Sequence, residues 1–285
     1  MISSLRRFFE ELKVEHTLFA LPFAYAGALL GARGIPSLHA LAWITIAVLG
    51  ARTAAMAANR LLDARLDAKN PRTARRHVAS GKLPAAWMVW AIVAGLVLLT
   101  IAAWQLNPLC LALLPIGVAA LVIYPLVKRW TWAVHFVLGA VDGLAPLGAW
   151  IAVTGKIELG GILLFCAVTM WVAGFDIWYA LMDRDFDLAQ GVRSIPARFG
   201  VVVASWLPEL LHGLVVVALA WLGFVIHARP LYWVGILFAA MLLVYETVLV
   251  ARQRDTRALN TAVFNANMLF SVAFFVSTAA SVIVT

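Results

Sequence analysis

Nine long apolar runs follow one another along the 285-residue chain, and they limit its possible folds more than any other feature. A helix needs about 20 mostly apolar residues to cross the hydrocarbon core of a bilayer. The runs have about this length and lie roughly at residues 17–33, 38–60, 84–106, 108–127, 132–154, 158–182, 202–227, 230–252 and 261–284. The sequence therefore predicts an all-α integral membrane protein with nine transmembrane helices, forming a single domain over residues 1–285.

The composition excludes several other classes of protein. Hydrophobic residues make up 64% of the chain and charged residues 13%, and the mean hydropathy is +0.94. A soluble domain is nearer half apolar and about a quarter charged. An ordinary soluble enzyme, a disordered chain and a fibrous protein are therefore excluded. The two cysteines, Cys110 and Cys166, fall inside apolar runs and suggest neither a disulfide framework nor a metal site. Residues 2–15 have the spacing of a short amphipathic helix on the membrane surface.

Basic residues are distributed unevenly between the two sides that nine spans would define. Of the 22 Lys and Arg residues, only Arg33, Lys156 and Arg229 fall opposite the N-terminal side, which leaves 19 on the N-terminal side. Cytoplasmic loops carry the excess of Lys and Arg in membrane proteins. We therefore expect a cytoplasmic N-terminus in a multi-pass protein of the inner, cytoplasmic membrane. Because the basic residues are spread over membrane-adjacent loops, the net charge of +8 does not indicate nucleic-acid binding.

The end of the second apolar run carries three oxygen-bearing side chains at helical spacing. Asn59, Asp63 and Asp67 are each four residues apart. Side chains at positions i and i+4 lie on the same face of a helix. The motif therefore predicts a stack of oxygen ligands at the cytoplasmic mouth of this helix.

A second acidic motif ends the sixth apolar run. Asp176, Asp183 and Asp187 occupy positions i, i+7 and i+11, and on one helix they share a face with Tyr179, whereas Asp185 points away. Asp176 lies about two turns inside the predicted span. Acidic residues within a membrane boundary are costly and usually functional. We therefore expect the two motifs to converge on one site.

The cytoplasmic segments add cations near both motifs: Arg72, Arg75, Arg76, Lys128, Arg129 and Arg193. Mg²⁺ takes oxygen ligands and commonly bridges to substrate phosphates, while Lys and Arg bind phosphate oxygens. The sequence thus favours a metal–diphosphate site, in which Asp63 with Asp67 holds one Mg²⁺ and Asp183 with Asp187 holds another. The alternative is that these acids are solvated charges or partners of the nearby arginines.

Arg52 lies two turns before Asn59, deeper in the second apolar run. A cation within the membrane requires an anionic partner. We expect that partner to be a carboxylate of the substrate. The alternative is an internal ion pair, for instance with a residue of an acidic motif.

Together these motifs resemble those of the UbiA superfamily of intramembrane prenyltransferases. The resemblance covers essentially the whole chain and rests on N-x-x-x-D-x-x-x-D at residues 59–67, D-x-x-x-x-x-x-D-x-x-x-D at residues 176–187, and Tyr124-Pro125. Many members have Asp directly after the Asn, where this chain has Arg60. They also have Arg-Pro where this chain has Arg76-His77.

The resemblance implies a fold and a reaction. It implies a nine-helix bundle around a central cavity, in which both acidic motifs face the cytoplasm. It also implies an enzyme that moves a polyprenyl group from a polyprenyl diphosphate to an aromatic hydroxy acid in quinone biosynthesis. Mg²⁺ would assist ionisation of the diphosphate, and the ring carbon ortho to the acceptor's hydroxyl would attack the allylic cation.

Each motif residue receives a role under this expectation. The catalytic set comprises Asn59, Asp63, Asp67, Asp176, Asp183 and Asp187, of which Asn59 and Asp176 complete or orient the metal shells. The expected substrate-binding set comprises Arg52, Arg72, Tyr124, Lys128, Tyr179 and Arg193. The two tyrosines steady the cation or bind the diphosphate, and the alternative for each is helix packing.

The acceptor and the prenyl chain length remain open at this point. Residues 16–23, 50–56 and 194–200 are similar to a branch of the superfamily that prenylates 1,4-dihydroxy-6-naphthoate on the futalosine route to menaquinone. Two acceptors therefore agree with the sequence: a 4-hydroxybenzoate-type acid for ubiquinone, and this naphthoate for menaquinone. Haem, chlorophyllide, homogentisate and glycerol phosphate are further acceptors within the superfamily. A secondary transporter is a remote alternative, disfavoured because the charges cluster on one side of the membrane.

Overall fold

The computed structural model describes residues 2–13, 17–252 and 256–284, and its side chains over residues 4–13, 20–252 and 261–284. His16, in one of the segments similar to the naphthoate branch, and Arg254, one of the 19 basic residues, lie outside the described residues. The described residues form helices and no strand. The helices are α1 Ile2–Leu12, α2 Thr17–Ala32, α3 Leu38–Asp67, α4 Ala86–Leu106, α5 Pro108–Val127, α6 Val134–Thr154, α7 Leu159–Met182, α8 Arg184–Gln190, α9 Ile195–Val225, α10 Pro230–Arg252 and α11 Thr256–Ile283.

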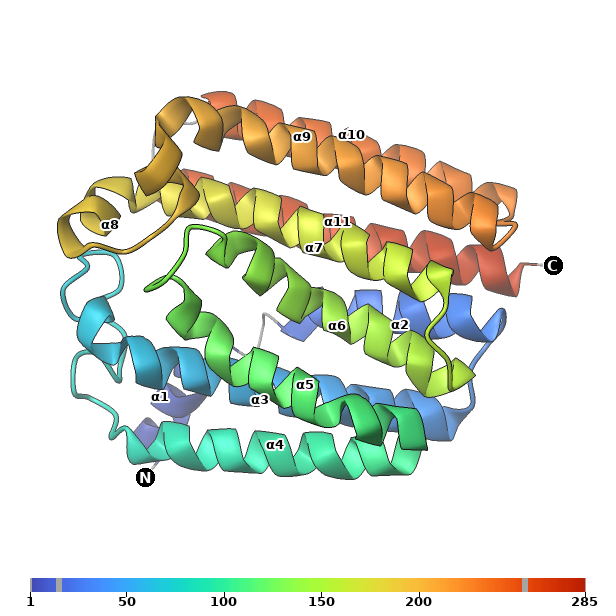
Figure 1. Cartoon of the computed structure of the whole chain (residues 1–285), viewed down its shortest axis with the longest axis horizontal. Coiled ribbons are helices and arrows are strands. Elements are labelled where there is room, and N and C mark those ends of the chain that lie inside the picture. The colour runs from blue at the N-terminus through green and yellow to red at the C-terminus, as the bar shows by residue number, and fades with distance from the viewer. Residues whose placement is uncertain (1, 14–16, 253–255, 285) are drawn as a thin grey trace.

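The all-helical membrane architecture predicted from the sequence is confirmed. Within the described residues, eight helices are long and apolar enough to cross a bilayer, namely α3 to α7 and α9 to α11. The remaining expected span corresponds to α2, which has 16 residues and an apolar stretch over Ala20–Ala32. The helices run side by side along the long axis, and α1 and the end of α11 lie at opposite ends of the bundle (Figure 1).

Breaker and capping residues end the helices largely where the sequence places them. Asn107 accepts a hydrogen bond from the Cys110 backbone N–H at 3.0 Å and is followed by Pro108 at the first helical position of α5. Proline suits that position because its missing N–H would be unpaired there in any case. Gly155, with φ 67°, ends α6 in the left-handed conformation that glycine adopts without strain.

Two helix boundaries differ from the sequence prediction. α3 continues to Asp67, so the loop expected from residue 61 begins after the whole acidic motif. α9 begins at Ile195, seven residues before the expected start, and bends at Gly200, where φ is 80°. Arg198 and Gly200 interrupt the apolar run and conceal this first turn in the sequence, although Ser194 and Pro196 supply a typical helix start.

Close backbone contact and aromatic packing hold the bundle together. A Cβ atom at Gly50 on α3 would lie 2.6 Å from the carbonyl oxygen of Gly95 on α4, so only glycine fits this crossing. On the other side, Phe23 of α2 and Phe270 of α11 each lie with their ring centroids 5.0 Å from that of Trp171 on α7. These contacts fix the walls of the space between α2, α3, α7 and α11.

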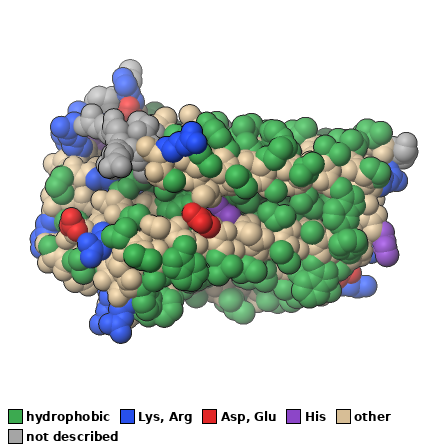
Figure 2. All heavy atoms as spheres, turned by 90° about the horizontal axis from the view of Figure 1, so that it is seen from above, with side chains coloured by type: hydrophobic (Ala, Val, Ile, Leu, Met, Phe, Trp, Pro, Cys, Tyr) green, Lys and Arg blue, Asp and Glu red, His purple; other side chains and the backbone are tan. Residues whose placement is uncertain are grey.

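The charged side chains lie mainly at one end of the molecule. Figure 2 shows a face covered by apolar side chains, with most of its Lys and Arg toward the end that carries α8 in Figure 1. Of the amphipathic segment predicted at residues 2–15, Ile2–Leu12 forms α1, and residues 14 and 15 lie outside the described residues. Leu12 of α1 is buried, and Phe8 packs against the α3–α4 region. The buried Glu11 of α1 pairs with Arg60 of α3 at 3.6 Å, so α1 is held at this charged end. Its position on a membrane surface stays a prediction.

Candidate functional site: three adjoining cavities

Three neighbouring cavities lie within the bundle and share part of their lining. The polar cavity, of about 240 Å³, is lined by the acidic motifs of α3 and of α7–α8. The middle cavity, of about 580 Å³, extends from Asn59 and Asp176 to Arg52 and Asp142. The apolar cavity, of about 320 Å³, lies among α3, α5 and α6 beyond Arg52 and Asp142. Tyr124 and Leu138 line all three cavities.

The first acidic motif lies on a continuous helix, as the spacing predicts. Its two aspartates are buried and face cations from other segments: Lys128 Nζ lies 2.5 Å from Asp63 Oδ2, and Arg76 Nη1 lies 2.6 Å from Asp67 Oδ2. Asn59 Oδ1 accepts a hydrogen bond from the neighbouring Arg60 at 3.2 Å. The first motif therefore presents two carboxylates whose charge is balanced by the protein itself.

The second acidic motif is interrupted, contrary to the expectation of one helix face. α7 ends at Met182, Asp183 leaves helical geometry at φ −102° and ψ 4°, and α8 then begins at Arg184. The last turn of α7 tightens, because the Asp183 N–H bonds to Ala180 and Leu181. The side chain of Asp183 makes a two-atom contact with Arg72, whose Nε lies 2.9 Å from Oδ1. Despite the break, the motif's three aspartates line the polar cavity.

A serine and a histidine, in place of Lys or Arg, hold the other two aspartates of the second motif. Ser194 Oγ donates a hydrogen bond to Asp187 Oδ2 at 2.8 Å, and His135 Nδ1 lies 2.7 Å from Asp176 Oδ2. Asp185 is exposed and pairs with Arg184, which confirms that it points away from the site. Burial raises the pKa of Asp187 to about 6, while the hydrogen bond from Ser194 acts in the opposite direction.

The remaining predicted residues reach the cavities to different degrees. Tyr124 is buried and donates a hydrogen bond to the Ala55 carbonyl at 3.4 Å, while its side chain lines all three cavities. Tyr179 lines the polar and middle cavities, and its ring contacts Phe175 with centroids 6.0 Å apart. Arg193 lies at the exposed edge of the polar cavity and donates to the backbone carbonyl of Trp130.

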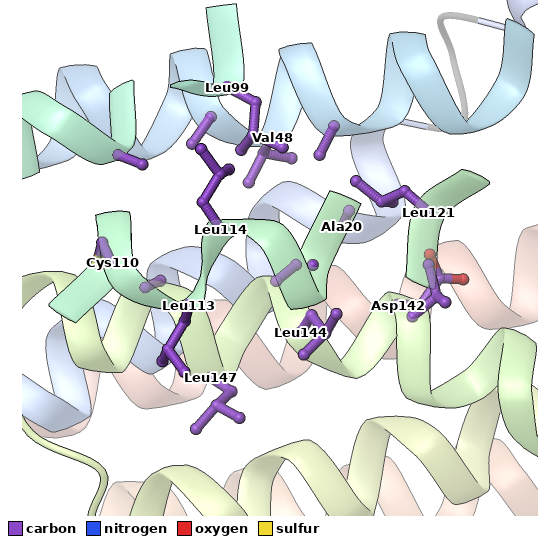
Figure 3. A pocket seen from close by; sticks show the side chains of 18 of the residues that line it. Ala20, Val48, Leu99, Cys110, Leu113, Leu114, Leu121, Asp142, Leu144 and Leu147 are labelled. Atoms are coloured by element: carbon purple, nitrogen blue, oxygen red, sulfur yellow. The ribbon is translucent and has the colours of Figure 1, made fainter. Parts of the chain in front are cut away.

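Arg52 forms an internal ion pair with a residue outside the acidic motifs. Its Nη1 lies 3.1 Å from Asp142 Oδ1, and both residues line the middle and apolar cavities. Figure 3 shows Asp142 at the edge of the apolar cavity, among mostly apolar side chains that include several leucines. The ion pair therefore lies at the boundary between the apolar cavity and the middle cavity.

Sequence reasoning missed the role of three residues in this site. Asp142 has only its position on a helix as a signal, and His135 shows no metal-ligand spacing. The buried Asn70 donates a hydrogen bond to Asp183 at 3.3 Å and accepts one from the Arg72 backbone N–H at 2.9 Å. Its place after the first motif, in Asn70-Pro71-Arg72, is the one signal that points to it.

The donor set of the polar cavity fits divalent cations. Asp63 Oδ1 is buried and has no hydrogen-bond partner among the described residues, so it offers a free ligand oxygen. The polar cavity is also lined by Asp67, Asp183 and Asp187, and hard cations such as Mg²⁺ prefer carboxylate oxygens. Within the described part of the chain, however, no three acidic, His or Cys side chains converge as a formed metal site. Lys and Arg side chains instead occupy the positions beside several of the carboxylates.

Comparisons with known proteins agree with this architecture. Residues 20–275 match the UbiA prenyltransferase family. A 4-hydroxybenzoate octaprenyltransferase of Alkalilimnicola ehrlichii is 32% identical over 254 residues, which cover 87% of this chain and 84% of that protein. A protein with the same description from Marinobacter nauticus is 34% identical over 253 residues, covering 88% of this chain and 85% of that protein.

Solved structures extend the similarity to the whole bundle. A UbiA homolog from Aeropyrum pernix K1, 31% identical, matches with a TM-score of 0.82 over 95% of this chain and 98% of that chain. A UbiA homolog from Archaeoglobus fulgidus, bound to GPP and Mg²⁺, matches with a TM-score of 0.68 over 96% and 99% of the two chains, and at 17% identity it supports the fold alone. The chain therefore belongs to the UbiA prenyltransferase family and is an enzyme of the prenyltransferase class.

Proposed function

We propose that this enzyme transfers a polyprenyl group from a polyprenyl diphosphate to an aromatic hydroxy acid of the 4-hydroxybenzoate type, in ubiquinone biosynthesis. One observation carries the proposal: a cavity rich in carboxylates and cations adjoins, through the middle cavity, an apolar cavity large enough for part of a prenyl chain. The two relatives described above carry the name 4-hydroxybenzoate octaprenyltransferase, which supports this acceptor.

The polar cavity binds the diphosphate head of the donor in this proposal. Asp63 and Asp67 hold one Mg²⁺, and Asp183 and Asp187 hold another, while Asn59 and Asp176 orient these groups. When bound, the metal ions neutralise the charge that develops on the departing diphosphate. Arg72, Lys128 and Arg193 line the same cavity and hold the phosphate oxygens.

The transferred carbon then lies between the polar and middle cavities. Tyr124 and Tyr179 line both cavities there, and an aromatic ring can stabilise a nearby cation through its face. The apolar side chains around the middle cavity, such as Phe175 and Trp171, exclude the water that would quench an allylic cation. The acceptor's ring carbon ortho to its hydroxyl attacks, forms the new carbon–carbon bond and then loses its proton.

The acceptor binds in the middle cavity, with its carboxylate at Arg52. Because Arg52 already pairs with Asp142 at 3.1 Å, the acceptor must compete with Asp142 for the guanidinium group. A second acceptor, 1,4-dihydroxy-6-naphthoate, also has a carboxylate and an activating hydroxyl. It stays the alternative because three segments of the chain are similar to the branch of the superfamily that uses this acceptor.

The enzyme lies in the inner membrane as one nine-span domain with its active site at the cytoplasmic face. Two observations support this arrangement. Only three of the 22 Lys and Arg residues fall on the side opposite the N-terminus. α1 and the C-terminal end of α11 also lie at opposite ends of the bundle, which agrees with an odd number of crossings.

A direct assay tests the reaction. The purified protein is incubated in detergent with MgCl₂, octaprenyl diphosphate and equal amounts of 4-hydroxybenzoate and 1,4-dihydroxy-6-naphthoate, and products are identified by mass spectrometry. The proposal expects prenylated 4-hydroxybenzoate with release of diphosphate, and no product when EDTA removes the metal. Prenylation of the naphthoate alone would contradict the proposed acceptor but support the proposed prenyl transfer. No transfer to either acid would contradict both the acceptor and the reaction.

Two variants test the position of the acceptor. We expect Arg52→Gln to raise the KM for the acceptor because the carboxylate loses its cation. We expect Asp142→Asn to lower that KM, because Asp142 no longer competes for Arg52. The KM for the polyprenyl diphosphate serves as the control and stays constant in both variants. An unchanged acceptor KM in Arg52→Gln would move the acceptor away from this residue.

A further inference from the structure

A buried histidine in the wall of the polar cavity connects one acid of the second motif to the start of α9. His135 lies at the second position of α6 and is 2% exposed. Its Nδ1 lies 2.7 Å from Asp176 Oδ2, and its Nε2 lies 3.2 Å from the backbone nitrogen of Ile195. The ring of this α6 residue therefore connects α7 with the start of α9.

The two contacts determine which ring nitrogen carries the proton. Ile195 is the first residue of α9, and its N–H has no carbonyl partner within the helix. That N–H can only donate, so Nε2 accepts and is unprotonated. The ring proton therefore sits on Nδ1 and is donated to Asp176. A neutral histidine in one fixed tautomer thus directs the carboxylate.

Asp176 occupies a position that none of the other motif aspartates has. It lines both the polar and the middle cavity, whereas Asp63, Asp67, Asp183 and Asp187 line the polar cavity and not the middle one. The place where the donor's first carbon meets the acceptor is the boundary between these cavities. The orientation of this single carboxylate therefore bears on the reacting atoms.

We propose that His135 is a positioning residue that, anchored by the first turn of α9, fixes the Asp176 carboxylate at the junction of the donor and acceptor sites. This inference rests on the proposed function for the identity of the two substrates. Groups that orient a functional side chain from behind typically contribute about 10–100-fold. His135 acts on turnover through its hydrogen bond to Asp176.

Three substitutions separate this role from simple packing. His135→Leu keeps the bulk but removes both hydrogen bonds, and we expect kcat to fall about 10–100-fold while the KM for the polyprenyl diphosphate stays constant. His135→Gln can donate to Asp176 and accept from Ile195 through one amide, and we expect it to restore most of kcat. An equal loss of kcat in the Gln and Leu variants would overturn the proposal, and so would wild-type kcat in the Leu variant.

A double-mutant cycle with Asp176→Asn tests whether His135 acts through this acid. We expect the double variant His135→Leu with Asp176→Asn to be no slower than Asp176→Asn alone, because the second change removes what His135 positions. Multiplying losses would overturn the proposal. Lys128→Gln is the matched control, since it acts on Asp63 of the other motif, and its loss of kcat/KM should multiply with that of His135→Leu.

The same cycle measured on thermal unfolding needs no substrate. Neighbouring groups that interact show non-additive effects on stability, so the shifts in unfolding temperature for His135→Leu and Asp176→Asn should not add. Additive shifts would show that the two side chains do not interact, and would overturn the proposal. Absence of prenyl transfer by the wild-type enzyme would instead contradict the proposed function, while the unfolding cycle would still decide the role of His135.

Discussion

The two acidic motifs reach the same cavity by different structural means. The motif of α3 lies on an unbroken helix, and its aspartates are balanced by Lys128 and Arg76. The motif of α7 and α8 is broken at Asp183, and two of its aspartates are held by neutral donors, Ser194 and His135. Regular helix geometry is sufficient to align the first motif, whereas the second depends on the start of α9. Charge balance therefore matters most for the first motif and orientation for the second, and four experiments test this difference.

The largest effect is expected at the aspartates themselves. We expect Asp63→Asn and Asp183→Asn each to lower kcat at least about 100-fold, because each removes charge that holds a metal ion at the diphosphate. Product formation is measured by mass spectrometry at saturating MgCl₂. Asp185→Asn is the matched control, since this acid lies in the second motif but is exposed. Retention of activity in either site variant would contradict the two-metal assignment.

The cation of the first motif provides the next test. We expect Lys128→Gln to lower kcat/KM for the polyprenyl diphosphate about 10-fold or more. The variant loses the ammonium group that lies beside Asp63 and binds a phosphate oxygen of the donor. Steady-state kinetics with varied donor measure the effect. Arg65→Gln changes the net charge equally but lies on the exposed side of α3, so it should behave as wild type. Equal effects of the two variants would show that Lys128 acts only through the net charge of the protein and does not contact the diphosphate.

The neutral donor of the second motif should have a smaller effect. Ser194→Ala removes both the hydrogen bond to Asp187 and the N-cap of α9, and we expect about a 10-fold loss of kcat. The capping loss alone costs about 1 kcal/mol of stability. Ser37→Ala removes only the N-cap of α3 and supplies the control, with lower stability and normal kcat. A normal kcat in Ser194→Ala would show that orientation of Asp187 does not limit the reaction.

The smallest effect is expected where the first motif meets the following loop. Thr73 is buried, and its Oγ1 donates to the backbone carbonyl of Asp67 at 3.1 Å. We expect Thr73→Val to lower the free energy of unfolding by about 1 kcal/mol and to leave kcat close to the wild-type value. Thermal unfolding and the prenyl-transfer assay measure the two quantities. A large loss of kcat would mean that the helix alone does not align the first motif.

Local patterns predicted one half of the site better than the other. Asn59, Asp63 and Asp67 align because a continuous helix needs only their spacing, and the spacing is in the sequence. The break at Asp183 leaves no comparable signal, because it depends on a tightened last turn and on contact with Arg72 from a distant loop. The same reasoning explains why the all-helical membrane architecture was predicted, since apolar length is also a local property.

The partners of the acids could not be predicted in the same way. Lys128 lies 65 residues from Asp63, and His135 lies 41 residues from Asp176, so no periodicity connects them. The alternative that arginines pair with the motif acids is confirmed for Arg72 and Arg76 in this structure. Arg52 pairs with Asp142, a residue 90 positions away on another helix, because a buried cation takes the nearest available carboxylate.

The pairing of three motif aspartates with Lys128, Arg76 and Arg72 has a consequence for the folded protein without substrate. These side chains are covalently attached counterions, so the cavity does not need dissolved ions to offset carboxylate repulsion. Removal of divalent metal should therefore stop turnover without unfolding the bundle. When the donor binds, its diphosphate exchanges ion partners within the nearly neutral polar cavity. Donor binding should therefore depend only weakly on ionic strength.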